Sequence, residues 1–140
     1  MTIEERAELA VETFAAGKGN CTQSVLCAWE DKIPVDHDTL MKLGAGYGAG
    51  MGCMQATCGA VSGAVMLAGL KNSCGDLEAP VSKGKTYQIS KQLVEAFQKK
   101  NGSLVCKELK GVETGCPLRS CNDCIADAAE LVEQILFAEK

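Results

Sequence analysis

Aromatic residues make up only 4% of this sequence of 140 residues, and β-branched residues occur only in short groups. No segment alternates apolar and polar residues in the way that a half-buried β-strand requires. We therefore expect an all-α fold, in the form of a bundle of about five to six helices around a central helix rich in glycine and alanine. The length fits a single domain, and no repeat or boundary divides residues 1–140.

Histidine is almost missing from the sequence. His37 is the only one, and it lies between two aspartates in a polar turn, so we expect it at the surface rather than among metal ligands. Cysteine–histidine catalysis therefore has little support. The chain also lacks the C-x-x-C-H motif, so covalent attachment of haem is not supported.

Clusters of basic residues are absent as well, and the net charge is −4. This balance disfavours a nucleic acid or an anionic membrane as partner. Residues 1–6 are acidic and lack the apolar run of a signal peptide, so we expect a cytoplasmic protein. Residues 43–70 carry no charge, but only residues 58–70 are strongly apolar, which is short of the ~20 residues of a membrane span.

The uncharged stretch of residues 44–70 is the feature around which the rest of the sequence is organised. Glycine occupies every second position of residues 44–52, and an apolar helix pattern follows in residues 58–70. A loop without Cβ atoms lets its backbone approach a ligand closely, and a helix start offers unpaired N–H groups. We expect Gly50, Gly52 and Gly59 to contact a cofactor in this way.

Apolar residues at helical spacing predict helices over residues 2–16, 21–32, 39–43, 58–70, 83–100 and 121–137, with a short turn of helix at 106–109. The helix over 58–70 has alanine at every fourth position, with Gly59 and Gly63 alongside. This face of small side chains predicts that a neighbouring helix packs closely against it. Because the helix is apolar all round, we expect it to be the most buried one.

Nine cysteines are the unusual number in the composition. In a chain large enough to fold without disulfides, metal binding or redox chemistry is the commoner explanation, and burial as small apolar side chains is the alternative. Cys21, Cys58 and Cys121 fall in the first turns of predicted helices, and Cys106 opens a short polar turn. If these helix starts converge, they form a pocket of thiolates with lowered pKa values, which suits an iron–sulfur cluster or zinc.

The one C-x-x-C motif joins Cys121 to Cys124, and no second motif accompanies it, so the signal for a compact zinc site is weak. The two cysteines could instead form a redox pair on one helix face, or Cys124 could be a core position. For the other cysteines we expect a core position at Cys27, an ordinary loop thiol at Cys74, and loop positions without an assigned role at Cys53 and Cys116.

Four segments resemble a family of small bacterial and archaeal redox-active proteins that is named for the pattern C…GCAxxG…C…C. The first two segments are NCTQSV at residues 20–25 and TCGAVSG at residues 57–63. The third consists of Phe97, the Asn-Gly pair at residues 101–102 and CKEL at residues 106–109, and the fourth spans residues 121–130. The family's four cysteines correspond to Cys21, Cys58, Cys106 and Cys121. The chain departs from the pattern at Thr57, where the family has glycine.

The resemblance implies a redox role. A related domain of split-Soret cytochromes is similar to an iron–sulfur-binding module, which favours a cluster or another thiolate-bound metal on these four cysteines. Two alternatives stay open: a thiol–disulfide oxidoreductase with Cys58 or Cys121 as the nucleophile, and a helical interaction domain with structural cysteines. The resemblance names no redox partner, and it leaves both enzymatic activity and a homodimer open.

Overall fold

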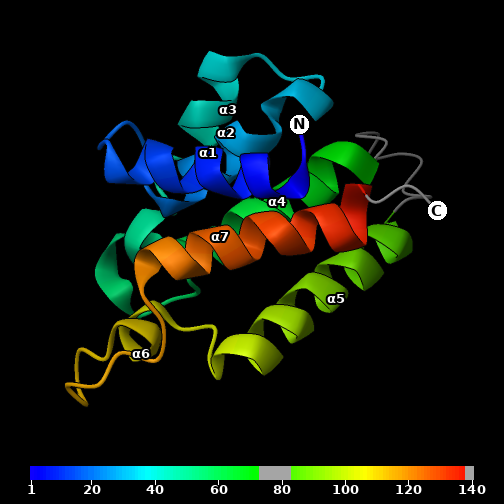
Figure 1. The fold of residues 1–140 in the computed structure, drawn as a ribbon. Helices are drawn as coiled ribbons and strands as arrows, with labels where there is room; N and C mark the ends of the chain where they lie inside the picture. The colour runs from blue at the N-terminus through cyan, green and yellow to red at the C-terminus, as the bar shows by residue number, and fades with distance from the viewer. Residues whose placement is uncertain (73–82, 138–140) are drawn as a thin grey trace.

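The computed structural model describes residues 1–72 and 83–137, and this part of the chain is helical (Figure 1). The α-helices are α1 (Ile3–Ala15), α2 (Cys21–Trp29), α3 (His37–Gly44), α4 (Gly59–Asn72), α5 (Lys83–Asn101), α6 (Cys106–Lys110) and α7 (Cys121–Leu131). The shorter segments are η1 (Glu30–Lys32), η2 (Gly50–Met54) and η3 (Val132–Phe137), of which η3 continues α7. Cys74 lies outside the described residues.

The prediction of an all-α fold is confirmed, because the described residues form no β-strand beyond one isolated bridge between Thr57 and Val105. The expected bundle of about five to six helices is not confirmed, since the described ranges contain seven α-helices, of which α6 has only five residues. No helix in these ranges combines the length and the apolar composition that crossing a membrane requires.

Polar side chains fix where α1 and α2 begin. The N–H of Glu5 donates to the Thr2 hydroxyl over 3.1 Å, and the N–H of Thr2 donates to the Glu5 carboxylate over 3.2 Å. Asn20 and Gln23 form the same reciprocal capping box at the start of α2. Helix α2 therefore begins at Cys21, as the sequence predicts, and this cysteine occupies a fixed position.

Helix α4 lies at the centre of the bundle, where it packs against α2, α5 and α7 (Figure 1). Gly63 faces α2 closely, since a Cβ on it would lie 2.9 Å from the carbonyl oxygen of Thr22 and 3.1 Å from Cβ of Val25. The predicted close approach of a neighbouring helix is thus confirmed.

The expectation that this central helix is the most buried one holds for the number of buried residues but not for their share of the helix. Helix α2 buries six of its nine residues, whereas α4 buries seven of fourteen. Burial in α4 continues to Leu67 and Ala68, and only the C-terminal end of the helix leaves the core, where a Cβ on Gly69 would meet open space. The apolar sequence of α4 therefore marks burial as far as Ala68 but not over the last turn.

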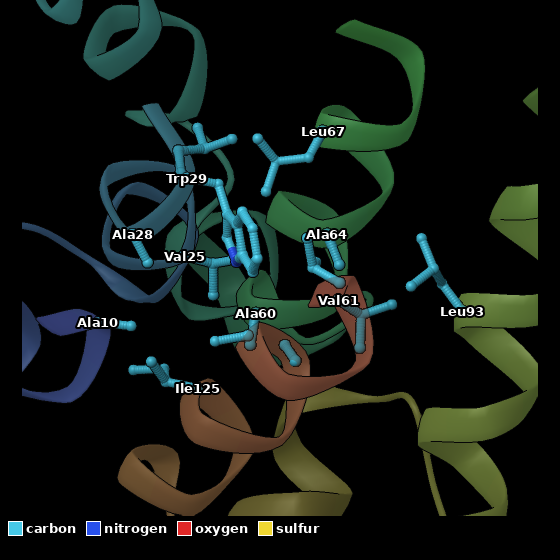
Figure 2. Packing of buried hydrophobic residues seen from close by; sticks show 14 of the residues in the cluster. Ala10, Val25, Ala28, Trp29, Ala60, Val61, Ala64, Leu67, Leu93 and Ile125 are labelled. Atoms are coloured by element: carbon cyan, nitrogen blue, oxygen red, sulfur yellow. The ribbon is translucent and has the colours of Figure 1, made fainter. Parts of the chain in front are cut away.

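The apolar core surrounds α4 as far as Ala68. Figure 2 shows Ala60 and Ala64 of α4 among Val25 of α2, Leu93 of α5 and Ile125 of α7, all of which are buried. Small side chains on α4 let three helices approach it and fill the space with larger residues from their own faces.

Trp29 joins both ends of the chain to this core. Its ring stacks on Phe137 with the ring centroids 4.5 Å apart, and the guanidinium of Arg6 lies 4.1 Å from the ring centroid. Arg6 is itself buried, and it donates hydrogen bonds to the carbonyl oxygen of Ala28 over 2.7 Å and to Asp31 over 2.6 Å. The charge of Arg6 is therefore paired although it lies inside the fold.

Replacing Gly63 by alanine is expected to lower the free energy of unfolding by roughly 1–3 kcal/mol, because the new Cβ would press on the backbone of α2. Gly69→Ala is the matched control on the same helix, and we expect it to be neutral or stabilising by up to ~1 kcal/mol. Urea denaturation of the parent and both variants measures the difference. Equal stability of Gly63→Ala and the parent would contradict the close crossing of α2 and α4.

Candidate cysteine site

Four helix starts meet at one end of the bundle, and each carries a cysteine. Cys21, Cys106 and Cys121 are the first residues of α2, α6 and α7, and Cys58 directly precedes α4. All four line one cavity of about 240 Å³, which we call the cysteine cavity. Its lining also includes Cys124, Asn20, Gly48, Ala49, Gly59, Phe14, Leu109, Lys110 and Arg119.

The pair Cys58 and Cys106 is brought together by the backbone. The N–H of Cys58 donates to the carbonyl oxygen of Leu104 over 2.6 Å, and the N–H of Cys106 donates to that of Ala56 over 3.0 Å. These two bonds flank the isolated bridge between residues 57 and 105. Two segments about fifty residues apart in the chain therefore run side by side and present their cysteines together.

Cys21 reaches the cavity through the close crossing of α2 and α4. Gly59 lies directly against it, since a Cβ at Gly59 would overlap with the sulfur of Cys21. The hydroxyl of Thr22 donates to the carbonyl oxygen of Gly59 over 2.8 Å, which fixes the two helices at this point. Cys21 can therefore lie beside Cys58 only because residue 59 is a glycine.

Cys121 is positioned by the segment that follows α6. The carbonyl oxygen of Leu109 accepts hydrogen bonds from the N–H groups of Leu118, over 2.9 Å, and Arg119, over 3.2 Å. These bonds fold the segment back on α6. The Ser120 hydroxyl then accepts from the N–H of Asp123 over 3.1 Å and caps α7, so that Cys121 faces the cavity.

The glycine-rich stretch forms one wall of the site. Gly48 and Ala49 line the cavity, and Gly50 packs on the outer side of Cys106, where an added Cβ would lie 2.6 Å from Cys106 Cβ. Gly52 is exposed, with open space where a Cβ would lie. Of the three glycines expected to contact a cofactor, only Gly59 is among the lining residues.

The thiol of Cys58 differs electrostatically from its neighbours. A hydrogen bond from Cys124 lowers the pKa of Cys58 to about 7, although burial opposes this effect. The backbone N–H groups of Ala60 and Val61 at the start of α4 and the charge of Lys110 lower this pKa further. Cys58 therefore ionises at a lower pH than an ordinary thiol.

The thiols of Cys106, Cys121 and Cys124 resist ionisation. Burial raises the pKa of Cys106 and of Cys121, and the neighbouring sulfurs raise both further. The hydrogen bond that Cys124 donates to Cys58 raises the pKa of Cys124. The hypothesis of a pocket of thiolates with lowered pKa values thus holds for Cys58 and is wrong for Cys106 and Cys121, because desolvation outweighs their position at helix starts.

Two basic side chains, which the sequence did not single out, also line the cavity. The charge of Lys110 lowers the pKa of Cys58 and counteracts the effect of burial on Cys106 and Cys121. Arg119 is held by the buried Asp127, to which its Nε and Nη2 donate over 3.0 and 3.1 Å. Lys110 thus places a positive charge beside the thiols, whereas the charge of Arg119 is paired with that of Asp127.

Of the remaining described cysteines, only Cys124 lines the cavity. Cys53 and Cys116 are exposed, and Cys27 is half-buried beside Met41. Cys124 lines the cavity together with Cys121, its partner in the motif, but it donates its hydrogen bond to Cys58. The contact between Cys58 and Cys124 joins two separate helices, so no spacing along the chain could have revealed it.

In the reduced, metal-free protein, the rate at which iodoacetamide alkylates Cys58 is expected to follow an apparent pKa of about 7, because the thiolate is the reacting form. Mass spectrometry across a pH series measures the rate at each cysteine. Cys124→Ala is expected to raise this apparent pKa, whereas Cys116→Ala, at an exposed position, is expected to leave it unchanged. A Cys58 profile that coincides with that of Cys116 in the parent protein would contradict the thiolate assignment.

Residues 19–135 match one protein family, whose description reads "Putative redox-active protein (C_GCAxxG_C_C)". Comparisons with the curated proteins and with the solved structures found no match. The matched range contains all the cysteines of the cavity, including the four at the helix starts. Because the match covers most of the 140 residues, the chain belongs to this C_GCAxxG_C_C family.

Proposed function

We propose that the protein binds an iron–sulfur cluster through Cys21, Cys58, Cys106 and Cys121, and that it transfers electrons or senses redox state. The observation that carries this proposal is the presence of four cysteines from four separate helix starts in the lining of one cavity. Four thiolates are the usual ligand set of such a cluster.

The pKa values of the site support a metal as occupant. Cys58 ionises readily, whereas burial and the neighbouring sulfurs raise the pKa values of Cys106 and Cys121. A metal centre compensates several thiolates at once, because the positive charge of the metal ions replaces the protons that the ligands lose on binding. Four neighbouring cysteines in a buried place are therefore best explained by a cation that neutralises them.

The size of the cavity favours a cluster over a single ion. One zinc ion bound by four thiolates at about 2.3 Å would leave most of the 240 Å³ unfilled. A cluster contains several metal and sulfide atoms and occupies more of this space. When bound, the cluster would supply one-electron redox chemistry, and this chain would hold it and set its surroundings.

Other lining residues suit the second shell of such a centre. Phe14 and Leu109 exclude water from part of the cavity, and Lys110 adds a positive charge beside the thiols. Burial, nearby charge and hydrogen bonds to sulfur are the properties that set the potential of a cluster. The proposal includes an unidentified redox partner and leaves room for a homodimer. It places the protein in the cytoplasm, because this reducing compartment keeps nine cysteines as thiols.

A thiol–disulfide oxidoreductase is the second candidate, and the contact between Cys58 and Cys124 favours it. The Cys58 thiolate would attack a small-molecule disulfide, form a mixed disulfide and release one thiol. Cys124 would then lose its proton and attack Cys58 Sγ, closing a Cys58–Cys124 disulfide and releasing the second thiol. The substrate disulfide is reduced by two electrons, and the protein dithiol is oxidised by the same two.

Anaerobic reconstitution of the purified protein with ferrous iron and sulfide tests the first proposal. The parent is expected to retain iron and sulfide after desalting and to show absorption that bleaches on reduction. Serine at Cys21, Cys58, Cys106 or Cys121 is expected to abolish or strongly reduce the retained iron, since each substitution removes a ligand. Cys53→Ser and Cys116→Ser are the matched controls at exposed positions and should retain the parent's iron content.

The same preparation distinguishes the two candidates. If the parent retains no iron, or if Cys58→Ser retains as much as the parent, the cluster proposal fails. Treatment of the metal-free protein with oxidised glutathione, followed by peptide mapping, then tests the second candidate. A Cys58–Cys124 disulfide that forms in the parent and is missing in Cys124→Ala would support the oxidoreductase.

A further inference from the structure

A second group of metal-ligating side chains lies outside the cysteine cavity. Cys27 in the last turn of α2, Glu30 in η1 and His37 at the start of α3 each offer one ligand atom, and these atoms all lie within 4.8 Å of one another. None of the three lines the cysteine cavity. The proposed redox site therefore makes no use of them.

The corner between α2 and α3 brings these residues together. Cys27 and Glu30 are three residues apart, so their side chains project from neighbouring positions on the helical surface. Helix α3 packs on α2, and Asp36 caps it by accepting from the N–H of Thr39 over 3.0 Å. This cap fixes the first turn of α3 and with it the backbone of His37.

Contacts within the group restrict its side chains further. Nδ1 of His37 lies 2.6 Å from the Glu30 carboxylate, so these two side chains are already held against each other. The Cys27 thiol is half-buried and donates to the sulfur of Met41 over 3.6 Å. Thiol, carboxylate and imidazole thus face one another from three consecutive segments of the chain.

We propose that Cys27, Glu30 and His37 form a second metal site that binds a single divalent ion of the zinc class. Zinc binds thiolate, imidazole and carboxylate ligands at about 2.0–2.3 Å, so donor atoms within 4.8 Å of one another need only small side-chain rotations to reach a common ion. One thiolate and one carboxylate balance the charge of the ion. Since His37 and Glu30 are partly exposed, water completes the coordination.

Substitution of Met41 distinguishes a zinc site from a site for a softer metal ion. Its thioether touches the Cys27 sulfur, and thioether ligands favour monovalent copper rather than zinc. In a zinc site Met41 is a packing neighbour of the ligand. Replacing Met41 by leucine should therefore leave zinc affinity intact, whereas replacing a ligand should not.

His37 gives the experiment a single reporter, because it is the only histidine in the chain. The reduced, ¹⁵N-labelled full-length protein is titrated with zinc sulfate beyond one equivalent, so that binding at the cysteine cavity is saturated first. The imidazole nitrogen resonances of His37 are expected to shift to the values of a metal-bound ring. Cys58→Ser, which alters only the other site, should show the same His37 shift.

Variants of the three ligands test the site further. Cys27→Ser and His37→Ala are expected to weaken zinc binding at this site at least about tenfold in competition with a chromophoric chelator. Met41→Leu and Asp38→Asn, an exposed neighbour of His37, are the matched controls and should bind as the parent does. Folding is not at risk in His37→Ala, since that side chain is 59% exposed.

Two results would overturn the assignment. The first is a His37 imidazole signal that does not move under saturating zinc, which would leave Glu30 and His37 as a plain surface pair. The second is a loss of zinc affinity in Met41→Leu as large as that in Cys27→Ser, which would assign the sulfur pair to a softer ion. Either result leaves the iron content of the cysteine cavity unaffected, so the two proposals fail independently.

Discussion

The closeness of α2 and α4 is the constraint on which the rest of the structure depends. Gly59 and Gly63 let the two helices meet almost backbone to backbone, and the Thr22 hydroxyl fixes the contact at the carbonyl oxygen of Gly59. Any larger residue at position 59 would displace the sulfur of Cys21. The same crossing therefore closes the core and places two cysteines beside each other, so that stability and chemistry rest on the same glycines.

The thiols of the cysteine cavity differ in how readily they ionise, and the balance of burial and nearby charge explains the difference. An N-terminal helix position lowers a thiol pKa only where it outweighs the cost of burial, and this is the case at Cys58 with the help of Cys124. At Cys106 and Cys121 burial prevails. The cavity thus combines Cys58, whose thiol ionises readily, with the thiols of Cys106 and Cys121, whose ionisation burial opposes. A bound cation would favour the ionised form of all three.

Much of this organisation could be predicted from the sequence, because helix caps and helical spacing are local signals. The starts of α2 and α7 follow from Asn20 and Ser120, and the close crossing follows from the small residues of α4. The bridge between residues 57 and 105 leaves no such signal, since it is a single long-range pairing. Nor did any pattern link His37 to Cys27, because the bend that joins α2 to α3 has no periodicity.

The order of the cysteines along the chain has a consequence for biosynthesis. The first and last residues of the four-cysteine set are Cys21 and Cys121, so they lie 100 positions apart, and the last one opens the final helix. If the four cysteines hold a cluster as we propose, a nascent chain lacks the complete ligand set until Cys121 has left the ribosomal exit tunnel. Loading of the cavity would then have to wait for α7, and the other three thiols would stay unligated until that point.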